Sequence, residues 1–227
     1  MAKLNRVTVL APAKLNLALD VVGTLPNGYH DLDMTMQAIT LYEKVVLTRS
    51  NGLNLTLPGS PVAANDSNTA IKAAIAFFRY TGLLAGVDIT VYKNIPVRAG
   101  MAGGSADAAA VLRALRDLIA PTLTDERLEE IGARVGSDVP FCVRGGTQLA
   151  EGRGERLTVL KNAPRLYAAV CKPDFPISTP ALFQRSDRVS LTDRPDTAAM
   201  LAALEAGDAA ALCASVKNVF EQVLPDE

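Results

Sequence analysis

The stretch Pro96–Ala110 constrains the fold of this chain most, because it places glycines between an expected strand and an expected helix. The strand covers residues 87–93, and a helix of small residues runs from residue 105 to residue 120. Glycines have no side chain, so their backbone amides can approach a bound group closely. The start of the helix adds N–H groups without partners and the positive end of a dipole. This order predicts a loop that binds phosphate, with an ordinary flexible turn as the alternative.

Composition narrows the class of protein. The 227 residues suffice for one large domain or two small ones. The formal net charge of −1, without a long basic run, argues against nucleic-acid binding. No apolar run reaches the roughly 18 residues of a membrane span, and the N-terminus lacks the apolar core of a signal peptide. We therefore expect a cytoplasmic protein, a monomer or weak homodimer, whose partner is a small phosphorylated molecule rather than nucleic acid or a membrane.

The three cysteines, Cys142, Cys171 and Cys213, are odd in number and far apart. They lack the spacing of metal ligands, and such a pattern is typical of reduced thiols in a cytoplasmic protein.

Hydrophobic alternation predicts strands before the glycine loop, at residues 4–11, 15–21, 33–47 and 53–57. Pro12 is expected to interrupt the first of them. Asn51–Gly52 indicates a hairpin turn before the last. A helix with Ser67 or Asp66 as its cap should run to Tyr80 and end at Gly82.

After the loop, the pattern predicts a second helix at 125–135 and a tight turn at Gly136–Phe141. Further strands are expected at 147–150, 155–160 and 166–171, the last of them buried, and then a proline-rich loop at 173–180 and helices at 197–204 and 208–223. Glycines cluster around residues 150–160, so we expect two domains, residues 1–156 and 157–227.

Several polar residues suit phosphoryl chemistry. No lysine follows Gly104, so the loop would bind phosphate through amides, the Ser105 hydroxyl and the helix dipole. Ser105 could also touch a metal ion on the phosphates, or simply cap the helix. Asp138 could take a proton from an attacking alcohol, or merely form a turn. Lys14 near Asp138 would keep that carboxylate ionised, while a solvated lysine at a strand end is the alternative.

His30 is the one histidine of the sequence, and Tyr29 precedes it. The pair could supply a stacking face and a hydrogen bond to a heteroaromatic ring. A histidine satisfied within its own loop is the alternative.

Four separated stretches resemble one superfamily of kinases, which includes galactokinase, homoserine kinase, mevalonate kinase and phosphomevalonate kinase. The stretches are residues 12–17 (PAKLNL), 27–30 (NGYH), 96–110 and 136–141 (GSDVPF). The NGYH and KLN elements narrow the resemblance to the 4-diphosphocytidyl-2-C-methyl-D-erythritol kinases, and the segment Lys172–Pro180 is similar to theirs as well. The resemblance covers most of the chain.

The resemblance implies a two-domain α+β fold. An N-terminal mixed sheet with helices would bind ATP, and a smaller C-terminal ferredoxin-like α/β domain, incomplete here, would bind substrate. The implied reaction is ATP-dependent phosphorylation of the 2-hydroxyl of a cytidine-diphosphate-linked methylerythritol, in non-mevalonate isoprenoid synthesis, with Mg²⁺.

The resemblance also implies residue roles. Asp138 and Lys14 match the catalytic pair. The loop that holds the ATP phosphates matches Pro96, Val97, Arg98, Ala99, Gly100, Met101, Ala102, Gly103, Gly104, Ser105 and Ala106. Residues expected beside the adenine are Asn68 and Lys93. Substrate contacts are implied for Asn16, Tyr29, His30, Thr179 and Phe183, the last as a stacking ring.

Two departures from the family pattern stand out. Many relatives carry glycine where Ala99 and Ala102 stand, and a methyl group is costly there only if φ is positive. The family normally continues past Phe220 and Glu221 with a second glycine-rich loop, a helix and a strand. Without these we expect an exposed sheet edge and weakened activity.

Two other functions stay open. One is another kinase of the superfamily, acting on mevalonate or a sugar, and the other is a non-catalytic nucleotide-binding module. Tyr29 and His30 favour the cytidine substrate over mevalonate or a sugar, because those have no base to stack.

Overall fold

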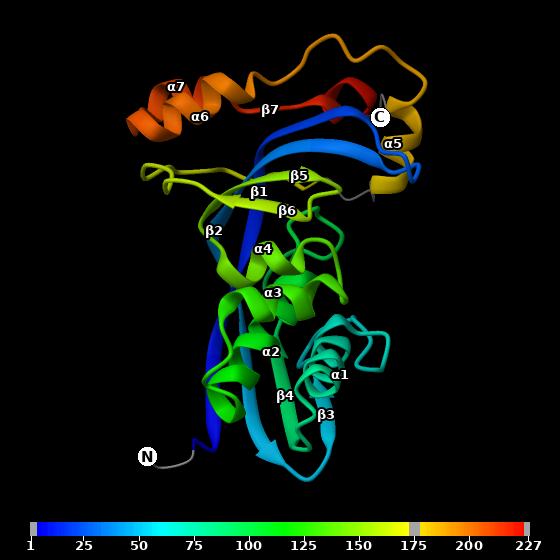
Figure 1. The fold of residues 1–227 in the computed structure, drawn as a ribbon, viewed down its shortest axis with the longest axis vertical. Helices are drawn as coiled ribbons and strands as arrows, with labels where there is room; N and C mark the ends of the chain where they lie inside the picture. Colours follow the sequence, from blue (N-terminus) through cyan, green and yellow to red (C-terminus); the bar gives the residue numbers. More distant parts are fainter. Residues whose placement is uncertain (1–3, 173–177, 225–227) are drawn as a thin grey trace. The chain divides into compact units, whose positions relative to one another are not determined.

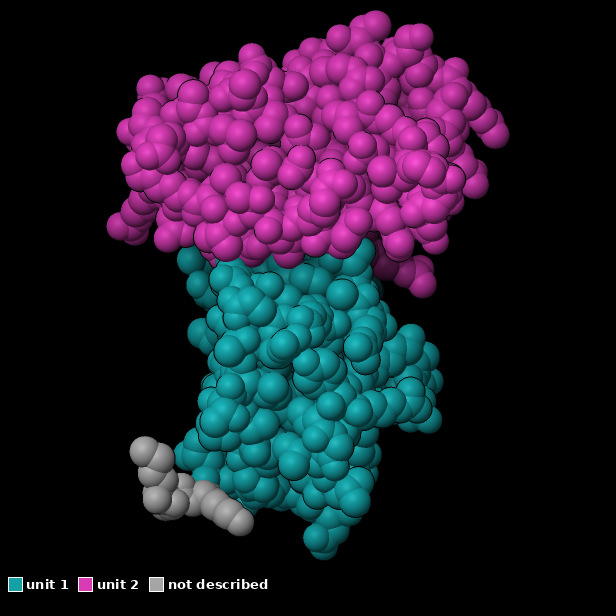
Figure 2. Space-filling view, viewed as in Figure 1, with its two compact units in different colours: residues 1–13, 39–97, 101–145 teal, residues 14–38, 98–100, 146–227 magenta. Residues whose placement is uncertain are grey.

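The computed structural model of the protein describes residues 4–172 and 178–224. Its α+β composition, with helices and a sheet of mixed parallel and antiparallel strands, confirms the predicted class. The chain forms two compact units that interleave along the sequence (Figure 2). The first unit comprises residues 1–13, 39–97 and 101–145, and the second comprises residues 14–38, 98–100 and 146–227. The expected division into domains at residue 156 stays a prediction, since compact units and ligand-binding domains are different descriptions.

Strand order in the first unit differs from the hairpin expected at Asn51–Gly52. β4 (Gly86–Tyr92) lies between β2 (His30–Ser50) and β3 (Leu53–Thr56), antiparallel to the former and parallel to the latter. The predicted hairpin is therefore wrong. A Cβ on Gly86 would stand 2.3 Å from the carbonyl oxygen of Ser50, so only glycine fits where β4 enters between the two strands.

Four helices complete the first unit: α1 (Thr69–Thr81), α2 (Gly103–Ile119), α3 (Asp125–Ala133) and α4 (Val139–Arg144). α1 and α2 pack side by side, and α4 packs against both α2 and α3 (Figure 1). The apolar positions of α2 are almost completely buried, as its small residues predict. α4 begins inside the stretch expected to be a tight turn.

The ends of α1 show which local signals decide a helix boundary. Asn68 is the N-cap, and its Oδ1 accepts a hydrogen bond of 2.9 Å from the backbone N–H of Ala70. The predicted caps Ser67 and Asp66 are therefore wrong by one and two residues. Gly82 ends the helix with a φ of 68°, as predicted.

In the second unit, shorter strands pair with the two long strands, β1 and β2. β5 (Thr147–Gly152) pairs with residues 32–37 of β2, and β6 (Arg156–Val159) pairs with β5, which confirms both expected strands. β7 (Lys217–Asn218) lies parallel to β1 at Ala18 and Leu19. α6 (Thr197–Ala206) and α7 (Ala209–Ala214) complete the apolar cluster of this unit, which includes Leu17, Met200, Leu204 and Leu212.

Three predictions fail in the strands and the C-terminal segment. β1 (Arg6–Thr24) runs through Pro12 without a break, because extended backbone tolerates the fixed φ of proline and loses only one donor. Residues 166–171 form no strand, and Tyr167 keeps 87% of its surface exposed. The expected helix at 208–223 ends with α7, and pairing of β7 with β1 interrupts it before a 3₁₀ turn at Val219–Val223.

α5 (Thr179–Ser186) was not expected, and it replaces the end of the predicted loop at 173–180. The rest of that loop, residues 173–177, lies outside the described residues. All three cysteines are free thiols, with Cys142 buried. Over residues 4–172 and 178–224, no helix is both long and apolar enough to span a membrane.

Candidate functional site

The glycine-rich stretch leads directly into α2. The helix begins at Gly103, two residues earlier than expected, so Ser105 lies within its first turn and is not its cap. Ala102 is the N-cap and offers no side-chain acceptor to the first N–H groups of the helix. Those amides and the positive end of the helix dipole suit an anionic ligand. Thr69 fixes this turn by donating a hydrogen bond of 2.7 Å to the carbonyl oxygen of Gly104.

The loop before α2 adopts left-handed backbone at three positions. Gly100 has a φ of 70°, Arg98 a φ of 56° and Ala102 a φ of 59°. Ala99 is not among the residues with positive φ. The two alanines that stand where many relatives have glycine are therefore unequal, because the left-handed conformation is strained only at Ala102.

Asp138 lies at the start of α4, in the first unit. It is the N-cap of that helix, yet its side chain makes no capping hydrogen bond. The turn before it comes close to the start of α2, since a Cβ on Gly136 would stand 3.9 Å from the Oγ of Ser105. Asp138 and Ser105 are thus carried by neighbouring turns of one compact unit, which is the arrangement that a phosphate loop with an acidic partner requires.

Lys14 and Asn16 belong to the second unit and lie on β1. The buried Lys14 ammonium donates a hydrogen bond of 3.0 Å to the Oδ1 of Asn16. A lysine whose side chain is only 6% exposed is not a solvated residue at a strand end, which was the alternative. Its expected pairing with Asp138 stays a prediction.

Aromatic rings contact one another in the second unit, and two of them, His30 and Phe183, are residues expected to bind the base. The rings of His30 and Phe183 stack with centroids 4.4 Å apart, and Phe220 meets Phe183 edge-on at 4.9 Å. His30 also shares a hydrogen bond of 2.8 Å with Asp187 through its Nε2. Tyr29 lies beside this group in sequence, with its ring 54% exposed and the Arg153 guanidinium 4.1 Å from the ring centroid.

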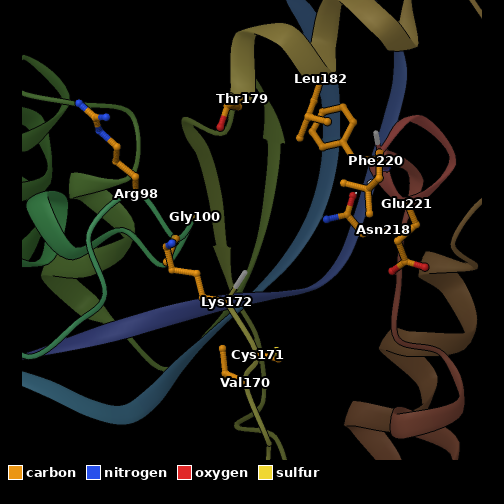
Figure 3. A pocket seen from close by; sticks show the side chains of 12 residues that line it. Arg98, Gly100, Val170, Cys171, Lys172, Thr179, Leu182, Asn218, Phe220 and Glu221 are labelled. Atoms are coloured by element: carbon orange, nitrogen blue, oxygen red, sulfur yellow. Dashed lines mark hydrogen bonds between the residues drawn. The ribbon is translucent and has the colours of Figure 1, made fainter. Parts of the chain in front are cut away.

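A cavity of about 310 Å³ opens in the same unit (Figure 3). Its wall includes Arg98 and Gly100 of the loop, Thr179 at the start of α5, and Lys172. In Figure 3 the Lys172 side chain extends toward Gly100. Phe220, Asn218 and Glu221 line the other side. In the same view the Arg98 side chain extends away from the other lining side chains, and the lining also includes the Glu221 carboxylate. The Lys172 ammonium and the Phe220 ring in one cavity suit a ligand that carries both phosphate and a ring.

Both residues expected beside the adenine have hydrogen-bond partners within the first unit. Asn68 caps α1 with its oxygen and donates from its nitrogen to the carbonyl oxygen of Ala63, at 2.9 Å. The Lys93 ammonium lies 2.6 Å from carboxylate oxygens of both Glu43 and Asp107. An adenine contact would have to share these groups, so their nucleotide role stays a prediction.

Sequence reasoning missed several residues of the second unit. Asp187, Asn218, Phe220 and Glu221 lie far from the recognised motifs in sequence, and they come to the cavity or to His30 through tertiary folding. Lys172 carried one available signal, because it opens the proline-rich segment that resembles the kinase family.

Comparison with known proteins decides the family. Residues 68–146 match the model of the GHMP kinases N terminal domain. The 4-diphosphocytidyl-2-C-methyl-D-erythritol kinase of Clostridium tetani is 40% identical over 220 residues, which are 96% of this chain and 79% of that protein. The kinase of the same name from Exiguobacterium sibiricum is 42% identical and matches 96% of this chain and 76% of its own length. The chain belongs to the 4-diphosphocytidyl-2-C-methyl-D-erythritol kinase family.

Solved structures agree with this membership. A crystal structure of a 4-(cytidine 5'-diphospho)-2C-methyl-D-erythritol kinase matches with a TM-score of 0.75 and 30% identity, over 95% of this chain and 76% of that one. Homoserine kinase from Cytophaga hutchinsonii matches with a TM-score of 0.69 at 16% identity, over 96% and 73% of the two chains. At that identity the second likeness shows a shared fold alone, whereas the first, together with the matched family model, confirms the predicted GHMP kinase architecture.

The loop geometry of this family member predicts opposite effects for its two alanines. Ala102→Gly should raise the free energy of unfolding by up to about 1 kcal/mol, because it relieves a left-handed alanine that costs roughly 1–2 kcal/mol. The matched control Ala99→Gly should lower it by about 0.5–1 kcal/mol, because it only adds freedom to the unfolded chain. Urea unfolding measures both, and equal effects of the two substitutions would contradict the assignment of strain to Ala102.

Proposed function

We propose that this chain transfers the γ-phosphoryl group of ATP to the 2-hydroxyl of 4-diphosphocytidyl-2-C-methyl-D-erythritol. The proposal rests above all on the 40% identity to the Clostridium tetani kinase across 96% of this chain. The cavity of the second unit supports it, because its lining combines the Lys172 ammonium, which suits a diphosphate, with the Phe220 ring, which suits a base.

Backbone groups would hold the nucleotide. In this proposal the stretch from Pro96 to Ala106 wraps the ATP phosphates, and the first amides of α2 donate hydrogen bonds to them. Over the described residues, no cluster of three or more His, Cys, Asp or Glu side chains could bind a metal ion. Mg²⁺ commonly binds through substrate phosphates and few protein ligands, and the Ser105 hydroxyl would be the protein ligand here. When bound, Mg²⁺ supplies positive charge to the phosphates.

Asp138 would receive the proton of the 2-hydroxyl as its oxygen attacks the γ-phosphorus. The bond from the γ-phosphorus to the bridging oxygen breaks, and ADP leaves with that electron pair. Lys14 would offset the negative charge of Asp138 and of the transferring group. The remaining contribution to catalysis is the positioning of the two reactants.

The second unit would select the substrate. Lys172 suits the diphosphate and Thr179 suits sugar or alcohol oxygens in the same cavity. Asn16, on β1, would contact a further alcohol oxygen. Tyr29 would offer a ring face to the cytosine. Since His30 and Phe183 stack on each other, a cytosine ring would extend this stack or separate its two rings.

The substrate assignment is tested by coupled ADP release in the presence of Mg²⁺. We expect turnover with the cytidine substrate, and tighter binding of that compound than of mevalonate, because mevalonate has no base to stack. Tighter binding of mevalonate would favour another kinase of the superfamily. ATP binding without any ADP release would favour a non-catalytic nucleotide-binding module.

The role of Asp138 predicts a variant that folds and does not turn over. Asp138→Asn should lower kcat by about 10²–10⁴-fold, because the amide cannot accept the hydroxyl proton. The fold should survive, since the Asp138 side chain makes no capping bond and asparagine is a good N-cap. Nucleotide affinity, measured by calorimetry, should stay close to that of the wild type. Turnover near the wild-type rate would rule out Asp138 as the proton acceptor.

The contact between Asp187 and His30 predicts an effect on substrate affinity alone. If Nε2 donates to the carboxylate, Nδ1 becomes an acceptor suited to the exocyclic amine of cytosine. Asp187→Ala should raise the KM for the cytidine substrate by about 2–10-fold, the size of one hydrogen bond, and leave the KM for ATP unchanged. Glu130→Gln is the control, because it removes an exposed ion pair with Arg127 that does not line the cavity. Equal changes in both KM values for Asp187→Ala would contradict this role.

A further inference from the structure

A buried ionic cluster of Lys93, Glu43 and Asp107 lies at the base of the glycine loop, inside the first unit. Lys93 follows β4 and precedes the loop, whereas Asp107 lies in α2, just after the loop. Lys93 Nζ is 2.6 Å from Asp107 Oδ2 and 2.6 Å from Glu43 Oε2. The two flanks of the loop are therefore joined by one ammonium group.

Glu43 contacts both flanks as well. Its Oε1 accepts a hydrogen bond of 3.3 Å from the backbone N–H of Ile95, ahead of the loop. The same oxygen lies 3.4 Å from the position that a Cβ on Gly103 would take, at the first residue of α2. A carboxylate at this point is favoured by the positive end of the α2 dipole.

The three side chains are buried, so an unbalanced charge among them would cost much free energy. The side chains of Lys93, Glu43 and Asp107 are 11%, 0% and 5% exposed. Within the described part of the chain, Asp107 Oδ1 is buried without a hydrogen-bond partner. Two carboxylates and one ammonium leave an excess negative charge, which a buried site disfavours unless one carboxyl is protonated. Burial, and then the neighbouring Glu43, raise the pKa of Asp107 from 3.8 to about 8, against the smaller opposing effect of Lys93.

We propose that Lys93, Glu43 and Asp107 are positioning residues that hold the two flanks of the nucleotide loop together, and that Lys93 does not contact the nucleotide. This rests on the proposed function only in taking the loop as the ATP site. The Lys93 ammonium, which the family resemblance places beside the adenine, is instead held by the carboxyl groups of Glu43 and Asp107.

A double variant that restores the charge balance of the cluster distinguishes a positioning role of Lys93 from direct contact with the nucleotide. Lys93→Met leaves buried Glu43 without its cation, so the displaced loop should raise the KM for ATP about tenfold or more. Adding Glu43→Gln removes the uncompensated charge and keeps an oxygen that can accept from the Ile95 N–H, so the neutral double variant should return to within about threefold of the wild type. The control Arg127→Met removes a cation from an exposed pair with Glu130 and should leave the KM for ATP unchanged.

Two readouts do not depend on the cytidine substrate. Affinity for a fluorescent ADP analogue should fall in Lys93→Met and recover in the double variant. Trypsin cleavage after the exposed Arg98, followed by mass spectrometry without ligand, should accelerate in Lys93→Met and slow again in the double variant. If the wild type fails to phosphorylate the cytidine substrate, the proposed function fails while these measurements still decide on the cluster.

The pH dependence of stability tests the charge state. A carboxyl group whose pKa is higher in the folded state than in the unfolded state stabilises the fold most at pH values below the unfolded pKa. For Asp107 this stabilisation declines as the pH rises from 3.8 to about 8. Asp107→Asn keeps a neutral group there, so its melting temperature should fall less than that of the wild type between about pH 5 and pH 8.

The proposal is overturned if the double variant keeps the raised KM for ATP of Lys93→Met, as direct contact with the nucleotide requires. Unchanged loop cleavage in Lys93→Met would also overturn it. If Lys93→Met does not fold, the double variant alone decides. A KM for ATP and a cleavage rate near those of the wild type support the proposal, and a KM for ATP raised tenfold overturns it.

Discussion

The Lys93 ammonium, held between Glu43 and Asp107, connects the strand that enters the glycine loop to the helix that leaves it. The loop holds left-handed backbone at Arg98 and Ala102, a conformation that costs free energy outside glycine and persists only where the surroundings enforce it. The cluster of Lys93, Glu43 and Asp107 constrains the loop at its two ends, because separating its buried charged groups costs much free energy. In our proposal the direction of α2, and with it the position of the amides that suit a phosphate, depends on this buried, charge-balanced cluster within the first unit.

The fold was predictable where a local signal decides the structure. Gly82 ends α1 because its left-handed φ suits glycine, and β4 follows from alternation over seven residues. Prediction failed where a distant partner decides. The turn at Asn51–Gly52 has a hairpin sequence, but β4 occupies the place beside β2. The pairing of β7 with β1 likewise overrides the helical pattern after α7.

Residues 166–171 illustrate a different limit. Their apolar run resembles a buried strand, but a run of this kind only states that burial would be favourable. Burial and pairing also need a neighbour, and in the described chain only Leu166 packs against the apolar cluster, while residues 167–171 stay exposed and the segment pairs with no strand. Sequence pattern therefore predicts what a segment tolerates, and the tertiary partners decide which of those states it adopts.

The candidate site divides along the same line. The loop and the turn before Asp138 are contiguous in sequence, so their motifs were readable, and their function depends chiefly on backbone groups. The group around His30 is assembled from distant segments, with Asp187 lying 157 residues away along the chain. Many ligands carry a phosphate that backbone amides can bind. A stacked ring held by a distant carboxylate would distinguish among these ligands. The part of the candidate site that a sequence hides most is thus the part to which we assign substrate selection in the proposed function.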